Sequence, residues 1–251
     1  MIPLSISVPT VRIYMCGRYR YVYMGREQGP FGVSMARRVI DLTMEFRTGL
    51  PVFPGYPVPI VHRWTSIEEH GYYSNLLMFV EHTGTHVDAP AHFIRDAPTI
   101  DRVPIERFMG RGVVIDVSDL EPRAAITANI IEQRLRELGV EIGPGWIVLF
   151  YTGYDAKAGT PEWFNHPGLD ESGAKFLAEK NVNAVGIDAP SIDHEPFPGH
   201  TTLLPKGIVI YENLTNLREL VKKPGFQFIG IPLKILNGSA SPVRAIAIIE
   251  E

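Results

Sequence analysis

The sequence has a single cysteine, Cys16, among its 251 residues. A disulfide within the chain and a metal cluster held by several thiolates are therefore both excluded. Such sparing use of cysteine is typical of a reducing compartment, so we expect the protein in the cytoplasm. The sequence also lacks any run of roughly 18 consecutive apolar residues, the length that a membrane-spanning helix needs, and we expect no membrane partner.

An excess of positive charge is missing as well. The chain has 24 Lys and Arg against 28 Asp and Glu, a net charge of −4, and no basic run, which argues against nucleic acid as a partner. No G-x-S-x-G or Walker-type motif occurs, which argues against a serine hydrolase or a nucleoside triphosphatase. What the chain does have is 45% hydrophobic residues, enough for a sizeable core, with 23 Gly and 21 Pro for turns.

The first 34 residues differ from the rest, because they mix apolar residues with scattered arginines and show no clear period. The stretch that begins at Met35 resembles the opening strand of a domain. We therefore interpret residues 1–34 as an N-terminal extension and residues 35–251 as one domain, with Met35 as a candidate natural start.

Short β-type runs dominate that domain. Runs rich in Val, Ile, Phe and Tyr and bounded by turn residues predict strands near 38–43, 58–65, 74–81, 112–117, 146–152, 183–187, 207–211, 226–231 and 243–249. Two helices are predicted, one capped by Thr127 and ended by Gly139, the other capped by Asp170 and ending near Asn181. Short helical turns are expected after Pro104 and Asn213. The pattern indicates a β-rich α/β domain.

The most informative segment is Glu81–Phe93, which reads EHTGTHVDAPAHF. Three of the eight histidines, His82, His86 and His92, fall within eleven residues together with Asp88. Imidazole and carboxylate are ligands for Zn²⁺, Mn²⁺ and Fe²⁺. With only three local ligands and no thiol nearby, the pattern favours an open, reactive metal site over a closed structural one.

The spacing of these residues requires a bent chain. Gly84, the two threonines, Val87 and Pro90 disfavour a helix, so we interpret the segment as extended. A straight strand would separate His82 from Asp88 by about 20 Å, too far for one ion. Gly84 is the residue best able to form the bend that would bring the two together.

The motif HTGTHVDAPAHF resembles the pattern H-x-G-T-H-x-D-x-P-x-H-F of metal-dependent hydrolases called the cyclase family, which includes bacterial kynurenine formamidases and isatin hydrolases. The resemblance spans about residues 38–248. It includes Val52–Gly55, Gly186–Asp193 and the C-terminal stretch from Pro232 to Ala245. It implies a swivelling β/β/α domain with mixed sheets, a homodimer or homotetramer, and an aromatic small-molecule substrate.

The resemblance also implies residue roles. His82, His86 and Asp88 would bind a first metal ion, and Asp88 would bridge to a second ion held by His200 and Glu212. His92 would be the catalytic histidine. The metal would be zinc or manganese, as one or two ions. Two positions depart from the pattern: Tyr56 replaces an Asp of the early loop, and Ser239 replaces the Asp of a formamidase-type Asp-Ala-Ser-Pro ending.

This constellation predicts hydrolysis of a non-peptide C–N bond, in an aryl formamide such as N-formylkynurenine or a cyclic amide such as isatin. Hydroxide formed on the metal would attack the carbonyl while His92 carries the proton to the leaving nitrogen. A metal-dependent lactonase and a non-catalytic, metal-assisted binding protein for an aromatic acid remain as alternatives.

Several further residues allow two interpretations each. Glu81 is either solvated or in contact with a ligand, and His194 is either an alternative ligand or a loop histidine. Ser191 is either a substrate contact or a turn residue. The aromatic residues either line a pocket or belong to the core, and these are Trp64, Tyr72, Tyr73 and Phe93.

Overall fold

The computed structural model describes residues 11–16, 19–24 and 37–250 of the chain. It divides into two compact units, Met1–Arg38 with Glu250–Glu251, and Val39–Ile249. In the first unit, β1 (Val11–Cys16) pairs antiparallel with β2 (Tyr19–Met24), two strands that the sequence pattern did not predict. Met35, the candidate natural start, lies outside the described residues, and the assignment of 1–34 as an extension stays a prediction.

The larger unit is organised by a mixed sheet, which has nine strands among residues 37–250. Its order is β14-β6-β12-β11-β9-β7-β13-β15-β3. The bounds are β3 (Arg37–Asp41), β6 (His86–Asp88), β7 (Met109–Asp116), β9 (Trp146–Tyr151), β11 (Ala184–Ile187), β12 (Val209–Glu212), β13 (Phe226–Ile229), β14 (Ala240–Pro242) and β15 (Ile246–Glu250).

The four central strands are parallel, and the strands on either side of them are antiparallel. The sequence accounts for this division, because β9 is a continuous apolar run, as expected of a parallel strand covered on both faces. All nine strands predicted from sequence correspond to observed strands. The short strands β8 (Ala125–Ile126), β10 (Gly168–Leu169) and β14 were not predicted. Strand β6 lies in the segment 81–93 that was interpreted as extended, but Pro90–His92 of that segment forms a helical turn instead.

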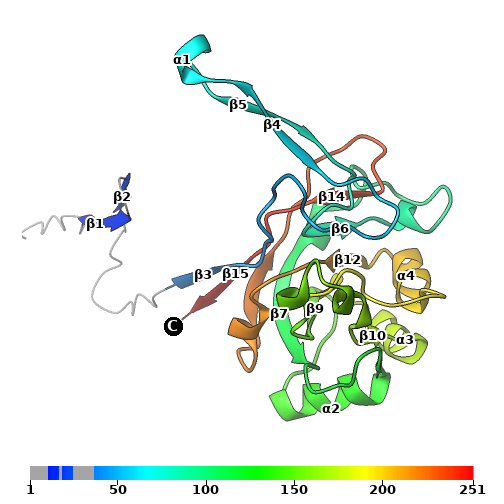
Figure 1. Cartoon of the computed structure of the whole chain (residues 1–251). Helices are drawn as coiled ribbons and strands as arrows, with labels where there is room; N and C mark the ends of the chain where they lie inside the picture. The colour runs from blue at the N-terminus through cyan, green and yellow to red at the C-terminus, as the bar shows by residue number, and fades with distance from the viewer. Residues whose placement is uncertain (1–10, 17–18, 25–36, 251) are drawn as a thin grey trace, which may run out of the picture. The chain divides into compact units, whose positions relative to one another are not determined.

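Helices cover one face of the sheet (Figure 1). The predicted helices are α2 (Ala128–Leu138) and α3 (Glu171–Glu179), and the hydroxyl of Thr127 and the carboxylate of Asp170 cap them as expected. Gly139 ends α2 in the left-handed conformation. The remaining helical segments are α1 (Ile67–His70), α4 (Pro198–Leu203), η1 (Pro90–His92), η2 (Ile105–Phe108), η3 (Tyr154–Lys157), η4 (Pro161–Asn165), η5 (Leu204–Lys206) and η6 (Leu217–Leu220).

Two apolar cores lie on the two faces of the sheet. One packs β7, β9 and β11 against α2, α3 and α4. The other contains residues from opposite ends of the strand order, such as Leu42 and Ala247 with Val87 and Tyr211. Contact between the two ends means that the sheet is curled, and its mixed strand directions match the swivelling β/β/α domain with mixed sheets that the family resemblance implies.

A two-stranded arm made of β4 (Ile60–Thr65) and β5 (Ser74–Met78), with α1 at its tip, projects away from the sheet (Figure 1). Its large apolar side chains are exposed, including Trp64, Leu76 and Met78. Among the described residues, Trp64, Tyr72 and Tyr73 are exposed, so they are not part of the buried core, and they do not line the cavity beside His82 and His92. In the part of the chain that the structure describes, no helix is long and apolar enough to cross a bilayer.

Candidate metal centre

The centre is built on two neighbouring antiparallel strands, β6 and β12. His86 and Asp88 are two residues apart on β6, so their side chains point to the same face. Glu212, the last residue of β12, pairs directly with His86 across the two strands. Cross-strand partners have their Cβ atoms about 5 Å apart, so this register places a third polar side chain beside the other two.

Gly84 forms the bend that the sequence predicts. Its φ of +64° lies in the left-handed region that glycine tolerates best. A Cβ at this position would also lie 2.9 Å from the Cδ2 atom of Leu50. The turn folds His82 back toward β6, and its Nδ1 lies 2.8 Å from Oδ1 of Asp88. Two residues that a straight strand would separate widely are thus in contact.

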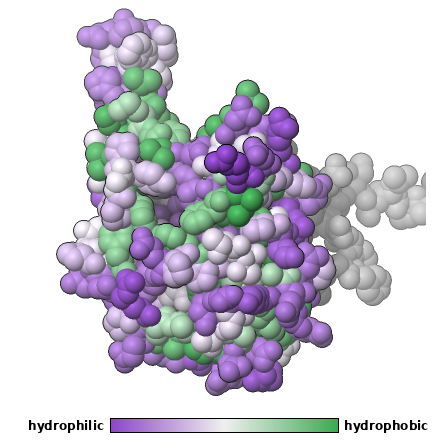
Figure 2. All heavy atoms as spheres, turned by 90° about the vertical axis from the view of Figure 1, so that its right-hand side faces the viewer, coloured by the Kyte–Doolittle hydropathy of each residue, from purple (hydrophilic) through white to green (hydrophobic). Residues whose placement is uncertain are grey.

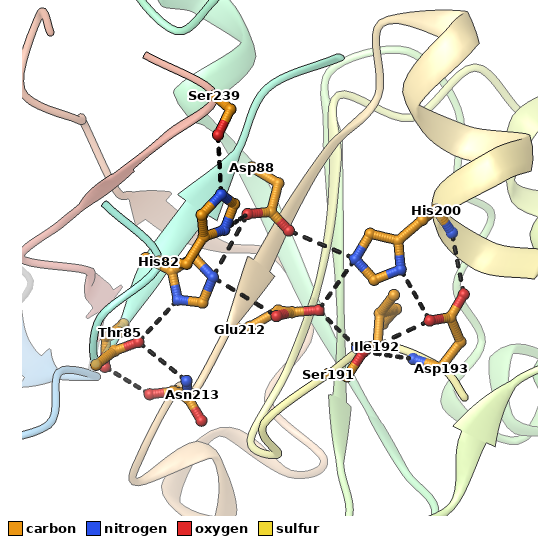
Figure 3. Close-up of polar contacts among 12 residues, drawn as sticks. His82, Thr85, Asp88, Ser191, Ile192, Asp193, His200, Glu212, Asn213 and Ser239 are labelled. Atoms are coloured by element: carbon orange, nitrogen blue, oxygen red, sulfur yellow. Dashed lines mark hydrogen bonds and ion pairs between the residues drawn. The ribbon is translucent and has the colours of Figure 1, made fainter. Parts of the chain in front are cut away.

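Asp88 is the hub of the cluster (Figure 3). Its carboxylate is fully buried, and Nε2 of His86 lies 3.4 Å from its Oδ1. Nε2 of His200 lies 3.5 Å from its Oδ2. Three imidazoles, two from the segment around Gly84 and one from α4, therefore surround one carboxylate.

Glu212 forms a second acidic group beside the first. Its Oε2 lies 3.5 Å from Nε2 of His86, and its Oε1 lies 3.4 Å from Nε2 of His200. The backbone N–H of Ile192 donates to Oε1 at 2.8 Å, which holds the carboxylate in place. The five residues predicted as metal ligands, His82, His86, Asp88, His200 and Glu212, are thus brought together.

His200 is oriented by Asp193, a residue to which the sequence analysis assigned no role. Nδ1 of His200 donates to Oδ1 of Asp193 at 2.8 Å, so its Nε2 lone pair faces Asp88 and Glu212. The other oxygen of Asp193 accepts from the backbone N–H groups of Gly199 and His200 at the start of α4. The Asp-x₆-His spacing, with Pro198 at the start of the short helix that contains His200, was the available signal.

The unpaired atoms of the cluster fit a cation. His86 Nδ1 donates to the carbonyl of Gly84 at 2.8 Å, which leaves its Nε2 as an acceptor. That Nε2 and both oxygens of Asp88 are buried and, within residues 37–250, have no hydrogen bond of acceptable geometry. Buried acceptors that converge without donors are normally neutralised by a proton or a metal ion.

The same demand for positive charge is visible in the pKa values. Burial would lower the pKa of His86, but Asp88 and Glu212 outweigh it and raise the pKa to about 9. Burial would raise the pKa of Asp88, but His82 and His86 hold it well below its ordinary value. His200 likewise has a raised pKa, because bonds to carboxylates outweigh its burial.

His92 lies beside this cluster, on the wall of a cavity. Its ring centroid lies 3.9 Å from that of His82, and its ligand atom is within 4.8 Å of those of His82 and Asp88. Burial lowers the pKa of His92 to about 4, and the neighbouring imidazoles add to the effect. It lines a cavity of about 180 Å³ together with aromatic residues, which are Phe53, Tyr56, Phe93 and Phe197.

The remaining sequence candidates are resolved by their contacts. His194 is no part of the cluster, because it stacks on His166 and its Nε2 contacts the carbonyl of that residue. Ser191 lines the cavity. Glu81 accepts hydrogen bonds from Ser239, which itself contacts His82. The sequence pattern indicated neither Ser239 as a neighbour of His82 nor Phe53 and Phe197 as lining residues.

The chain is similar to known proteins over most of its length. The model of the family described as putative cyclase matches residues 40–194. A kynurenine formamidase of Salinibacter ruber is 31% identical over 218 residues, which cover 83% of this chain and 96% of that protein. A crystal structure of an isatin hydrolase bound to the product analogue thioisatinate superposes with a TM-score of 0.81 at 27% identity, covering 86% of this chain and 93% of that one.

A third relative is described as a potential metal-dependent hydrolase with cyclase activity. It superposes with a TM-score of 0.70 at 29% identity and covers 86% of this chain and all of that one (100%). The likeness extends over the β-rich sheet and the helices alike, so the cyclase-like fold expected from the sequence is confirmed.

Proposed function

The chain belongs to the cyclase family, and from that membership we propose that it is a metal-dependent hydrolase of a non-peptide C–N bond. The bond would be that of an aryl formamide or a cyclic amide, the substrate classes named for the kynurenine formamidase and isatin hydrolase relatives. The observation that carries the proposal is the convergence of buried, unpaired atoms of Asp88 and His86, because His86 also lines the aromatic cavity.

His82, His86, Asp88, His200 and Glu212 would hold the metal, as zinc or manganese. Asp88 would serve both ions if two are bound, and the contacts of His82 with its Oδ1 and of His200 with its Oδ2 support this role. When bound, a divalent cation would lower the pKa of a water molecule and polarise the substrate carbonyl.

His92 would move the proton. Its lowered pKa, about 4, keeps the imidazole neutral at pH 7, so a lone pair is available to take a proton from the attacking water. Its place on the cavity wall beside His82 would allow it to pass the proton to the leaving nitrogen. Asp88 and Glu212 would contribute the negative charge that holds the metal.

The cavity supports a compact aromatic substrate. Its volume of about 180 Å³ is smaller than the roughly 300–1,000 Å³ of pockets for drug-sized ligands. Aromatic side chains on its wall would stack on a planar ring. We place the reaction in the cytoplasm, in line with the single cysteine of the sequence.

The experiment is a substrate panel on protein of known metal content. Chelated protein would be reloaded with Zn²⁺ or Mn²⁺ and tested on N-formylkynurenine, isatin and a simple aryl lactone, with Asp88→Asn as the control that should lose both metal and turnover. Turnover of either amide supports the proposal. Turnover of the lactone alone would make the protein a lactonase, and a metal-loaded protein that hydrolyses nothing would indicate a binding protein.

We further propose that the protein forms a homo-oligomer and that the β4–β5 arm is its contact surface. A two-stranded hairpin is at best marginally stable alone, and this one exposes apolar side chains on consecutive residues, Leu76, Leu77 and Met78, and hence on both faces. Figure 2 shows apolar side chains gathered along this arm. A second copy of the chain would cover them.

Sedimentation velocity tests the arm. The double variant Trp64→Ser with Leu76→Ser should shift the wild-type oligomer toward monomer, while Glu68→Gln in the exposed tip helix α1 should leave the distribution unchanged. A wild-type protein that stays monomeric at tens of micromolar would contradict the proposal.

A further inference from the structure

Behind His82, on the side away from Asp88, lies a pair of polar residues from two distant parts of the chain. Nε2 of His82 is 3.0 Å from the hydroxyl oxygen of Ser239 (Figure 3). That hydroxyl donates in turn to Oε1 of Glu81, and the backbone N–H of Ser239 donates to the same oxygen at 2.8 Å. His82, Ser239 and Glu81 therefore form a linear hydrogen-bonded relay.

The direction of the protons in this relay is fixed by its far end. An ionised carboxylate can only accept, so the single proton of the Ser239 hydroxyl points to Glu81. The hydroxyl then offers a lone pair to His82, whose Nε2 must carry a proton to donate to it. The ring is thereby oriented with its other nitrogen, Nδ1, toward the metal centre, 2.8 Å from Oδ1 of Asp88.

The backbone holds the relay together at both ends. The carbonyl of Ser239 accepts from the N–H of Ala89, the residue that follows β6, at 2.9 Å. Gly238 allows Glu81 to approach, since a Cβ at that position would lie 2.8 Å from Oε2 of Glu81. The loop before β14 and Glu81 are thus held in close contact.

We propose that Glu81 and Ser239 are positioning residues, which fix the tautomer and the ring orientation of His82 so that its Nδ1 serves the metal centre. The role at the metal rests on the proposed function, whereas the proton on Nε2 is a property of the metal-free chain. Groups that orient a metal-bound histidine in this way change metal affinity by 10- to 100-fold.

The first test measures the dissociation constant of Zn²⁺ by competition with a chromophoric chelator. Ser239→Ala and Glu81→Gln should each weaken binding 10- to 100-fold, and Ser239→Thr, which keeps the hydroxyl, should stay within threefold of the wild type. The double variant Ser239→Asp with Glu81→Gln, which moves the acid to position 239, should regain most of the lost affinity.

Matched controls separate this effect from a general loss of stability. Ser118 donates to Asp116 at 2.7 Å on the surface, so Ser118→Ala removes a similar serine–carboxylate pair remote from the centre and should not change Zn²⁺ affinity. The melting temperatures of the metal-free variants identify any that fold poorly. Unchanged Zn²⁺ affinity in well-folded Ser239→Ala would overturn the role at the metal.

The second test needs no metal. Nitrogen-15 NMR of the metal-free protein, labelled at histidine, should show His82 protonated at Nε2 in the wild type and in Ser239→Thr, and lose that signature in Ser239→Ala. A wild-type His82 protonated at Nδ1 alone would refute the relay. If the wild type has the expected tautomer but binds no Zn²⁺, the relay stands and the proposed function fails.

Discussion

Replacing His92 by alanine distinguishes two roles that the structure allows for this residue. Its imidazole lines the cavity, as a proton shuttle should, yet its ligand atom lies within 4.8 Å of those of His82 and Asp88, as a metal ligand could. A shuttle acts only during turnover, whereas a ligand contributes to metal affinity at all times. The two roles therefore predict different losses.

The expected loss for a shuttle follows from the protonation state of His92. A pKa of about 4 makes the imidazole more than 99% neutral at pH 7, so the wild type keeps the proton acceptor ready in nearly every molecule. General acid–base catalysis of this kind contributes about 10²–10⁴-fold to the rate. Removing the ring should lower kcat by that factor, which corresponds to about 3–5 kcal/mol in the barrier.

The assay measures steady-state turnover of whichever panel substrate the wild type hydrolyses fastest. Metal content and Zn²⁺ affinity are measured on the same samples. For His92→Ala we expect the kcat loss above, near-normal metal content and partial rescue by added imidazole, which can enter the space left by the ring. His92→Gln fills that space and should lose activity without rescue. Turnover that persists in His92→Ala, or a tenfold weaker Zn²⁺ affinity, would refute the shuttle.

Four other outcomes are expected. Asp88→Asn should weaken Zn²⁺ binding at least tenfold in equilibrium competition, because it removes the charge shared by three imidazoles. Gly84→Ala should lower the free energy of unfolding by about 1–3 kcal/mol in urea titrations, since its φ is positive and its Cβ would meet Leu50. Thr127→Ala should cost about 1 kcal/mol in the same assay, because α2 loses its cap. Burial keeps the pKa of His166 at about 4, below its ordinary value of 6.5, so the unfolded chain binds a proton that the folded chain does not. The wild type should therefore lose up to about 3 kcal/mol of stability as the pH falls from 6.5 to 4, and His166→Gln should lose less.

The local part of the centre could be predicted from the sequence. Two histidines and an aspartate at short spacing, with a glycine where a bend was needed, indicated a shared metal site, and the structure brings these side chains into contact. Helix caps were predictable for the same reason, because a cap depends on residues within one turn of the chain. The roles given to His200 and Glu212 came from the family resemblance, since neither residue stands out in the sequence.

By itself, then, the sequence determined the motif around Gly84, the β-rich α/β class and the ends of the two main helices. Only the tertiary structure decided that Glu212 faces His86, that Asp193 orients His200, and that Ser239 lies behind His82. The physical reason is range. Turns and caps are set by interactions between near neighbours, whereas the register that joins β6 to β12 depends on packing of the whole curled sheet.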